Sequence, residues 1–121
     1  MHHPRIYHGA CLLGNKIYVV GGFRVKTCEQ FALKSEKWSE ICDFDEWGRG
    51  VTLMAVKSCY LMAIGGIDVF EYPDSERLRR LDVRRMDRGW QIFNLNGTPG
   101  ICQAAFMLSE SEFLICGGQD K

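Results

Sequence analysis

The sequence predicts an all-β protein built from antiparallel four-stranded units, and a repeated motif is the main reason. A run of four apolar residues followed by a glycine pair occurs three times, as IYVVGG at 17–22, LMAIGG at 61–66 and FLICGG at 113–118. The first glycines of the pairs are 44 and 52 residues apart. Recurrence at roughly 40–50 residues is typical of repeat architectures. Short apolar runs before each pair and tryptophans after the first two support the same interpretation.

Each glycine pair ends a predicted hairpin. The apolar runs are GACLL and IYVV in the first copy, VTLMAV and YLMAI in the second, and CQAAFML and FLI in the third. The segments GNK, KSC and SESE separate the two runs of each copy. Short apolar runs joined by a few polar residues predict antiparallel strands. Because the runs are almost continuously apolar, we expect these strands to be covered on both faces.

Two further strands are predicted after each of the first two glycine pairs. The segments are CEQFALKSEKWSEI and ERLRRLDVRRMDRGWQIFNL, and each reads as a strand, a polar turn and a strand opened by tryptophan. Naming the strands of one unit A to D, the chain runs A-B-C-D, A-B-C-D, A-B. We expect a single partial assembly over 1–121, with units at about 5–42 and 49–95 and a half unit at about 101–118.

The glycines and tryptophans have predicted structural roles. A glycine pair suits a place where the backbone bends sharply, passes a neighbour closely or adopts a positive φ. A tryptophan offers a large surface for packing one sheet on the next. The residues concerned are Gly21, Gly22, Gly65, Gly66, Gly117, Gly118, Trp38 and Trp90.

These features together resemble the kelch repeat. Arg5 lies sixteen residues before Gly21, IYVVGG follows, and an aromatic strand C leads to SEKW; LMAIGG with Trp90 and FLICGG are similar in weaker form. The resemblance implies a partial kelch-type β-propeller in which strand A lines the central channel. The third copy departs from the pattern because Ile101 stands at the arginine position and strands C and D are missing.

About two and a half repeats fall short of the 4 to 8 blades of a propeller. The open third blade would expose the edge of its strand B, which favours association with another chain. We therefore expect a fragment of a longer kelch protein or a truncated product. A free-standing partial propeller, self-association and completion by a partner chain are the alternatives.

One loop face is the predicted binding surface. In an A-B-C-D blade the B–C and D–A loops share a face, and these loops carry FRVKT, IDVFEYPDSE, DFDEWGRG and NGTPG. Aromatic residues and arginine are common anchors of protein interfaces. The candidate residues are Arg24, Glu46, Trp47, Arg49, Phe70 and Tyr72. The alternative is that the aromatic residues only cover the blade ends. For Arg5 and Arg49 we expect a structural role, tying blades together through loop carbonyls.

The basic run RLRRLDVRRMDR could bind phosphate or nucleic acid, but acidic residues flank and interrupt it, so we expect solvated charge on the C–D edge. Fifteen basic residues balance fifteen acidic ones, which predicts neither a nucleic-acid nor a membrane partner. No apolar run approaches the ~18 residues of a membrane span. The six cysteines form no CxxC pair, so we expect reduced core thiols in a cytoplasmic protein.

Catalysis has little support in the sequence. No Ser-His-Asp set, Cys-His set or phosphate loop is apparent. We expect no cofactor, no metal and no enzymatic activity. The resemblance implies a protein-interaction module or scaffold, as in kelch proteins that bind the cytoskeleton or act with ubiquitin ligases. An alternative is a fragment of a kelch-propeller enzyme, a sugar oxidase or sugar-acid epimerase, which predicts His or Tyr at strand A; only Tyr7 and His8 qualify.

Overall fold

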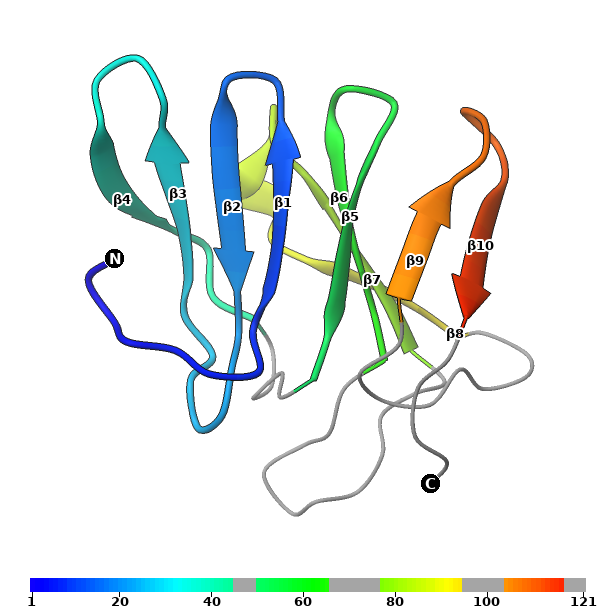
Figure 1. Ribbon diagram of the computed structural model, residues 1–121, viewed down its shortest axis with the longest axis horizontal. Coiled ribbons are helices and arrows are strands. Elements are labelled where there is room, and N and C mark those ends of the chain that lie inside the picture. The colour runs from blue at the N-terminus through cyan, green and yellow to red at the C-terminus, as the bar shows by residue number, and fades with distance from the viewer. Residues whose placement is uncertain (45–49, 66–76, 95–103, 117–121) are drawn as a thin grey trace.

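The computed structural model describes residues 1–44, 50–65, 77–94 and 104–116 (Figure 1). Within these residues the chain forms β-strands, one turn of 3-10 helix and no α-helix. The predicted all-β class is confirmed. The elements are β1 (Gly9–Leu13), β2 (Lys16–Val20), β3 (Cys28–Ala32), β4 (Lys37–Ile41), β5 (Thr52–Val56), β6 (Tyr60–Ile64), β7 (Arg77–Asp82), η1 (Met86–Arg88), β8 (Gln91–Asn94), β9 (Ala104–Met107) and β10 (Phe113–Cys116).

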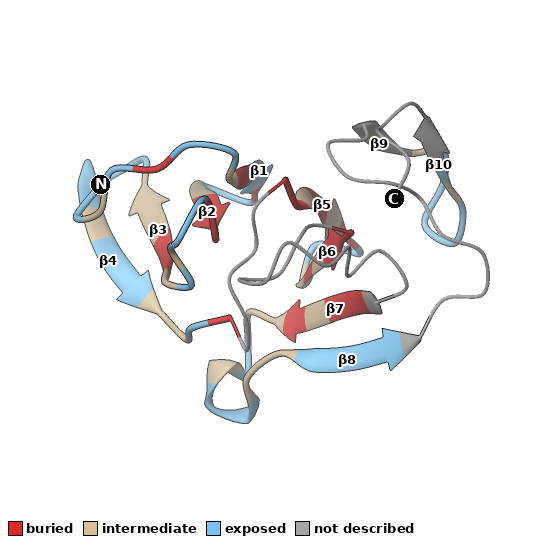
Figure 2. Cartoon of the chain, turned by 90° about the horizontal axis from the view of Figure 1, so that it is seen from below, coloured by how far each residue is buried: buried red, intermediate tan, exposed pale blue. Residues whose placement is uncertain are grey.

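The strands form three antiparallel sheets in chain order. β1 to β4 make a four-stranded sheet, β5 to β8 make a second, and β9 pairs with β10. Each predicted hairpin is present. In the first two hairpins, for example, Cys11 is paired with Tyr18, and Met54 with Met62. The sheets fan out from their first strands, since β1 lies beside β5 and β5 lies beside β9 (Figures 1 and 2). This arrangement is that of neighbouring propeller blades.

A hydrophobic core fills the space between the first two sheets. Alternation along each strand sends every second side chain to one face, so that Tyr18 and Val20 of β2 meet Leu53 of β5 and Leu61 of β6. Phe44, in the connection between the sheets, is part of this core and is 3% exposed. The opposite face of the second sheet packs through Met54 and Ile64 against residues of β9 and β10. The second sheet is therefore covered on both faces, as its apolar runs predict.

The glycine pairs end strand B at a bend of the backbone. Gly21 and Gly22 have φ of 65° and 129°, and Gly65 has φ of 72°, in the left-handed region that L side chains rarely adopt. Space is also limited at Gly22, where an added Cβ would lie 3.1 Å from the carbonyl oxygen of Ile6. Both predicted reasons for glycine, positive φ and close approach, hold at Gly22. Gly66, Gly117 and Gly118 lie outside the described residues.

The two predicted packing tryptophans differ in what they contact. Trp90, just before β8, has its ring centroid 4.7 Å from that of Phe44 and packs against the core between the sheets. Trp38 in β4 lies 5.0 Å from Phe31 of its own sheet. The role of joining one sheet to the next therefore holds for Trp90, whereas Trp38 packs within the first sheet.

Candidate functional site

Arg24 is the one member of the predicted binding face that falls within the described residues. Its side chain is exposed, and its guanidinium carbon lies 5.2 Å from the ring centroid of Phe23. The remaining candidates of that face, Glu46, Trp47, Arg49, Phe70 and Tyr72, lie outside the described residues. Their role in binding stays a prediction.

Three apolar residues that the sequence analysis missed lie beside Arg24. Ile6, Tyr7 and Phe23 are 59%, 57% and 40% exposed. The backbone N–H of Phe23 donates to the carbonyl oxygen of Ile6 at 2.9 Å, which brings the B–C loop against the segment that leads into β1. We call Ile6, Tyr7, Phe23 and Arg24 the loop-face patch. Ile6 and Tyr7 were missed because they precede strand A in a segment with no loop signal of its own.

The backbone at the loop-face patch is held in an uncommon conformation. Tyr7 and Arg24 both have φ of 59°, in the left-handed region. A bulky residue is rarely found there, and such residues occur preferentially at binding and catalytic sites. The N–H of Gly50, at the end of the D–A connection, donates to the carbonyl oxygen of Tyr7 at 2.8 Å. The B–C loop, the entry to β1 and the D–A connection thus meet at one face, as the topology predicts.

A buried arginine beneath the loop-face patch explains the sixteen-residue spacing between Arg5 and the glycine pair. Nη1 of Arg5 donates to the carbonyl oxygens of Gly21 at 2.8 Å and Thr27 at 2.6 Å. Nη2 donates to Oγ1 of Thr27 at 3.0 Å and to Oε2 of Glu29 at 2.7 Å. The expected bonding to loop carbonyls is confirmed, but the expectation that Arg5 ties blades together is wrong. It binds the B–C loop of its own sheet, because the entry segment crosses that loop. Arg49 lies outside the described residues.

Glu29 is the acidic partner of this arginine, and both side chains are fully buried. Its second oxygen accepts a hydrogen bond from the backbone N–H of His2 at 2.6 Å. Burial alone would raise the pKa of the Glu29 carboxyl, but the hydrogen bonds from Arg5, His2 and His3 together outweigh it and lower the pKa. The N-terminal segment is thereby fixed over the end of β3. Nη1 and Nη2 of Arg5 are occupied, and its Nε makes no hydrogen bond but is buried within a fully buried side chain, so Arg5 supports the face rather than contacting a ligand.

The basic run after residue 76 is partly buried, which corrects one expectation. Its first segment is strand β7, as preferred over a helix in the sequence analysis. Arg84, Arg85 and Arg88 are exposed as expected. Arg79, however, is only 4% exposed, and its guanidinium carbon lies 5.3 Å from the ring centroid of Phe44. The expectation of solvated charge is wrong for Arg79, because the β7 register directs it to the face that packs on the first sheet.

The described cysteines are free thiols, and Cys11, Cys28 and Cys42 pack in or against the core. Burial raises the pKa of the Cys11 thiol to about 12. Burial, with the neighbouring Cys42, raises the pKa of the Cys28 thiol to about 12 as well. Neither thiol forms an appreciable thiolate near neutral pH, so neither is a nucleophile there. The prediction of core thiols is confirmed for Cys11, Cys28 and Cys42. Cys59 is half-buried in the turn between β5 and β6, and Cys102 and the side chain of Cys116 lie outside the described set.

The described parts of the chain hold no group of three or more His, Cys, Asp or Glu residues placed to bind a metal ion. Over the same residues, no helix has the length and apolar character required to cross a bilayer.

Comparison with known proteins agrees with the geometry of the first sheet. The family model described as Kelch motif matches residues 4–41, which span Arg5, the glycine pair and all four strands of that sheet. No curated protein matches the chain. Residues 4–41 therefore carry a kelch motif, and the antiparallel four-stranded sheets are consistent with partial kelch blades.

Proposed function

We propose that this chain is a non-catalytic protein–protein interaction module of the cytoplasm that binds its partner through the B–C/D–A loop face. Kelch motifs in general mediate protein–protein interaction, and the motif here covers the first sheet. The observation that carries the proposal is the loop-face patch, where three exposed apolar side chains and an exposed arginine meet on one face.

The chemistry of the loop-face patch suits a protein partner. Interfaces are enriched in aromatic residues and arginine, and a few such residues supply most of the binding energy. Arg24 lies over the Phe23 ring, so that its charge and the aromatic surface are presented together. A partner that buries Phe23 while placing a carboxylate near Arg24 would use both groups.

The support beneath the loop-face patch favours binding without large rearrangement. Arg5 joins the entry segment to Gly21 and Thr27, and the hydrogen bond from Phe23 to Ile6 closes the same junction. A surface already held in its binding conformation loses less conformational entropy when a partner docks. The Arg5–Glu29 pair is therefore a positioning element of the face.

A matched pair of double variants tests the proposal. Phe23→Ser with Arg24→Glu removes an apolar and a basic residue from the loop-face patch. Leu33→Ser with Lys34→Glu makes the same changes at exposed residues in the turn between β3 and β4, on the opposite loop face; Leu33 is 45% exposed. The readout is the set of proteins that the purified chain retains from a cell extract, quantified by mass spectrometry.

We expect the control variant to retain the same proteins as the unmodified chain. The patch variant should lose at least one of them by about tenfold or more, the size of a hot-spot effect. Both variants should keep the melting temperature of the unmodified chain within a few degrees. Equal retention by the two folded variants would contradict the proposal.

A further inference from the structure

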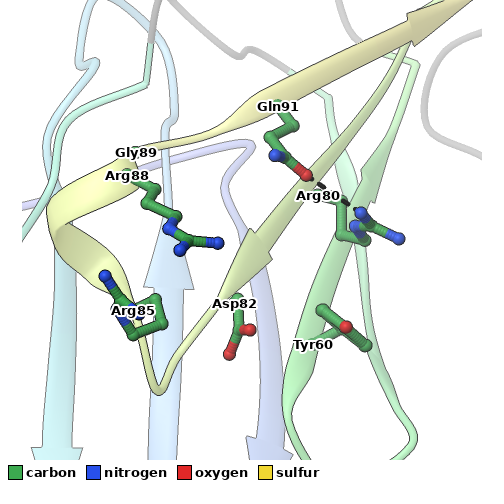
Figure 3. A pocket seen from close by; sticks show the side chains of 7 residues that line it. All are labelled: Tyr60, Arg80, Asp82, Arg85, Arg88, Gly89 and Gln91. Carbon is green, nitrogen blue, oxygen red and sulfur yellow. Dashed lines mark hydrogen bonds between the residues drawn. The ribbon is translucent and has the colours of Figure 1, made fainter.

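We propose that a second site, on the opposite loop face, binds a phosphoryl group. The site is a pocket of about 100 Å³ between β6, β7 and the connection to β8 (Figure 3). This inference is independent of the proposed protein-binding face, because the A–B and C–D loops of a blade lie at the other end of its strands. The lining residues are Tyr60, Arg80, Asp82, Arg85, Arg88, Gly89 and Gln91.

Arg80 is fixed in the wall of the pocket. Its guanidinium carbon lies 4.7 Å from the ring centroid of Tyr60 and 5.0 Å from that of Phe93. Its Nη2 donates to Oε1 of Gln91 at 2.9 Å (Figure 3). These contacts hold a planar donor group in one orientation, so little side-chain entropy is lost when it binds an acceptor.

Arg80 also has a donor that needs a partner. Its Nε is buried and makes no hydrogen bond. A buried donor without an acceptor is unfavourable, whereas a charged oxygen acceptor forms a strong hydrogen bond with a guanidinium. A phosphoryl oxygen would supply such an acceptor after a small shift of the Arg80 side chain that opens its Nε to the pocket. Surface arginines that are merely solvated would have neither the two stacking rings nor a buried unsatisfied N–H.

The charge around the pocket matches a dianion. Asp82 is already compensated, since Arg84 donates from Nε and Nη2 to its two oxygens, each at 3.0 Å. Arg85 contacts Asp87 at 3.4 Å. Four arginines, Arg80 included, against two aspartates leave a net charge of +2, and Arg80 and Arg88 have no carboxylate partner among the described residues.

A phosphate monoester carries about −1.5 to −2 at neutral pH. A carboxylate carries half of that charge and would leave one arginine uncompensated. Arg88 extends from η1 toward the space between β7 and the turn, and the guanidinium of Arg80 lies farther along the pocket, on the side of Tyr60 (Figure 3). Both arginines line the pocket, so each contributes positive charge to its wall.

The test is an NMR titration of the full chain with inorganic phosphate, performed at constant ionic strength maintained with chloride, because exposed charges are screened by salt. The amide signals to follow are those of Gly89 and Gln91, which line the pocket. A phosphoserine peptide and its unphosphorylated form are titrated in parallel. They distinguish a phosphorylated protein from free phosphate as the source of the group.

Three variants make the titration specific. Arg88→Gln removes one uncompensated charge, and Lys34→Gln is its matched control, an exposed basic residue in the C–D turn of the first sheet. Arg80→Lys keeps the charge but replaces the planar fork that stacks between Tyr60 and Phe93. We expect Arg88→Gln and Arg80→Lys each to weaken phosphate binding by about 10- to 100-fold, the range for a hydrogen bond to a charged group.

Saturable phosphate binding that Lys34→Gln leaves unchanged would support the site. If the phosphoserine peptide binds more tightly than inorganic phosphate, a phosphorylated partner is the source of the group. If the two bind equally tightly, the source is free phosphate. The proposal is overturned if phosphate does not saturate these signals, or if Lys34→Gln weakens binding as much as Arg88→Gln. Binding of an oligonucleotide without any phosphate binding would also overturn it, since an extended backbone would then be the ligand.

Discussion

The Arg5–Glu29 pair is the residue-level feature on which the loop-face patch depends. Both side chains are fully buried, and they join β3, the B–C loop and the N-terminal segment. Removing one partner of such a pair leaves an uncompensated buried charge, which costs about 3–5 kcal/mol. The pair therefore fixes the geometry of the face even if its net contribution to stability is small.

Glu29→Gln should consequently lower the free energy of unfolding by about 3–5 kcal/mol, measured by urea denaturation. The matched control is Glu40→Gln. Glu40 contacts Nε2 of His3 at 2.7 Å, but both side chains are about half exposed, and exposed pairs contribute roughly 0–1 kcal/mol. Equal destabilisation by the two variants would contradict the role given to the buried pair.

Acid should destabilise the protein because folding lowers the pKa values of two groups, His8 and Glu29. Burial, aided by Arg5, lowers the pKa of His8 below 6.5, so protonation below that pH favours the unfolded chain. The pKa of Glu29 is lowered below 4.5, so its contribution is present above pH 4.5 and is lost as the pH falls further. Urea melts from pH 7.5 to 4 should show stability falling first below pH 6.5. His8→Gln should remove that first decline; an unchanged profile would contradict the assignment.

The sequence predicted only one partner of the Arg5–Glu29 pair and only one residue of the loop-face patch. The arginine could be predicted because its position recurs sixteen residues before a glycine pair. Glu29 could not, because it is 24 residues away and becomes buried only when the N-terminal segment folds over it. Ile6, Tyr7 and Phe23 had no periodic signal. Their grouping depends on a backbone contact between two separate segments.

At the level of elements, the strands were predictable because the local pattern and the fold agree. Each apolar run with a short polar turn became a hairpin, and β7 became a strand despite its many arginines. Which β7 side chains point toward the first sheet could not be predicted. Whether Arg79 points inward depends on Phe44, which lies in the connection between the sheets and contributes the ring against which Arg79 packs.

The contact between β1 and β5 requires a small residue at Gly9. A Cβ added there would lie 3.0 Å from Cβ of Leu53 and 3.1 Å from the carbonyl oxygen of Val51. Because a backbone atom cannot move away cheaply, Gly9→Ala should destabilise the protein by about 1–3 kcal/mol in urea denaturation. Ala10→Val is the control, since Ala10 is exposed, and should change stability by under about 0.5 kcal/mol. A neutral Gly9→Ala variant would show that the first strands do not approach so closely.

For the molecule as a whole, the sheets gain their stability from one another. The core between the first two sheets contains residues of both and of the connection that joins them, and the second sheet buries its other face against β9 and β10. Repeat units that contact only their neighbours fold together when these interfaces are strong. The recurrence of the glycine pairs predicted the units, but not which side chains would join them.

Native-state hydrogen exchange across the full chain would show whether the first two sheets unfold as one cooperative unit, whose packing positions both loop faces. The interface between these sheets is buried and apolar, so we expect the slowest amides of β1–β4 and of β5–β8 to open with the same free energy. Leu61→Ala, in a fully buried position of that interface, should lower both values together. The two sheets do not form a single cooperative unit if their amides open with two distinct free energies and Leu61→Ala lowers only the opening free energy of the second sheet.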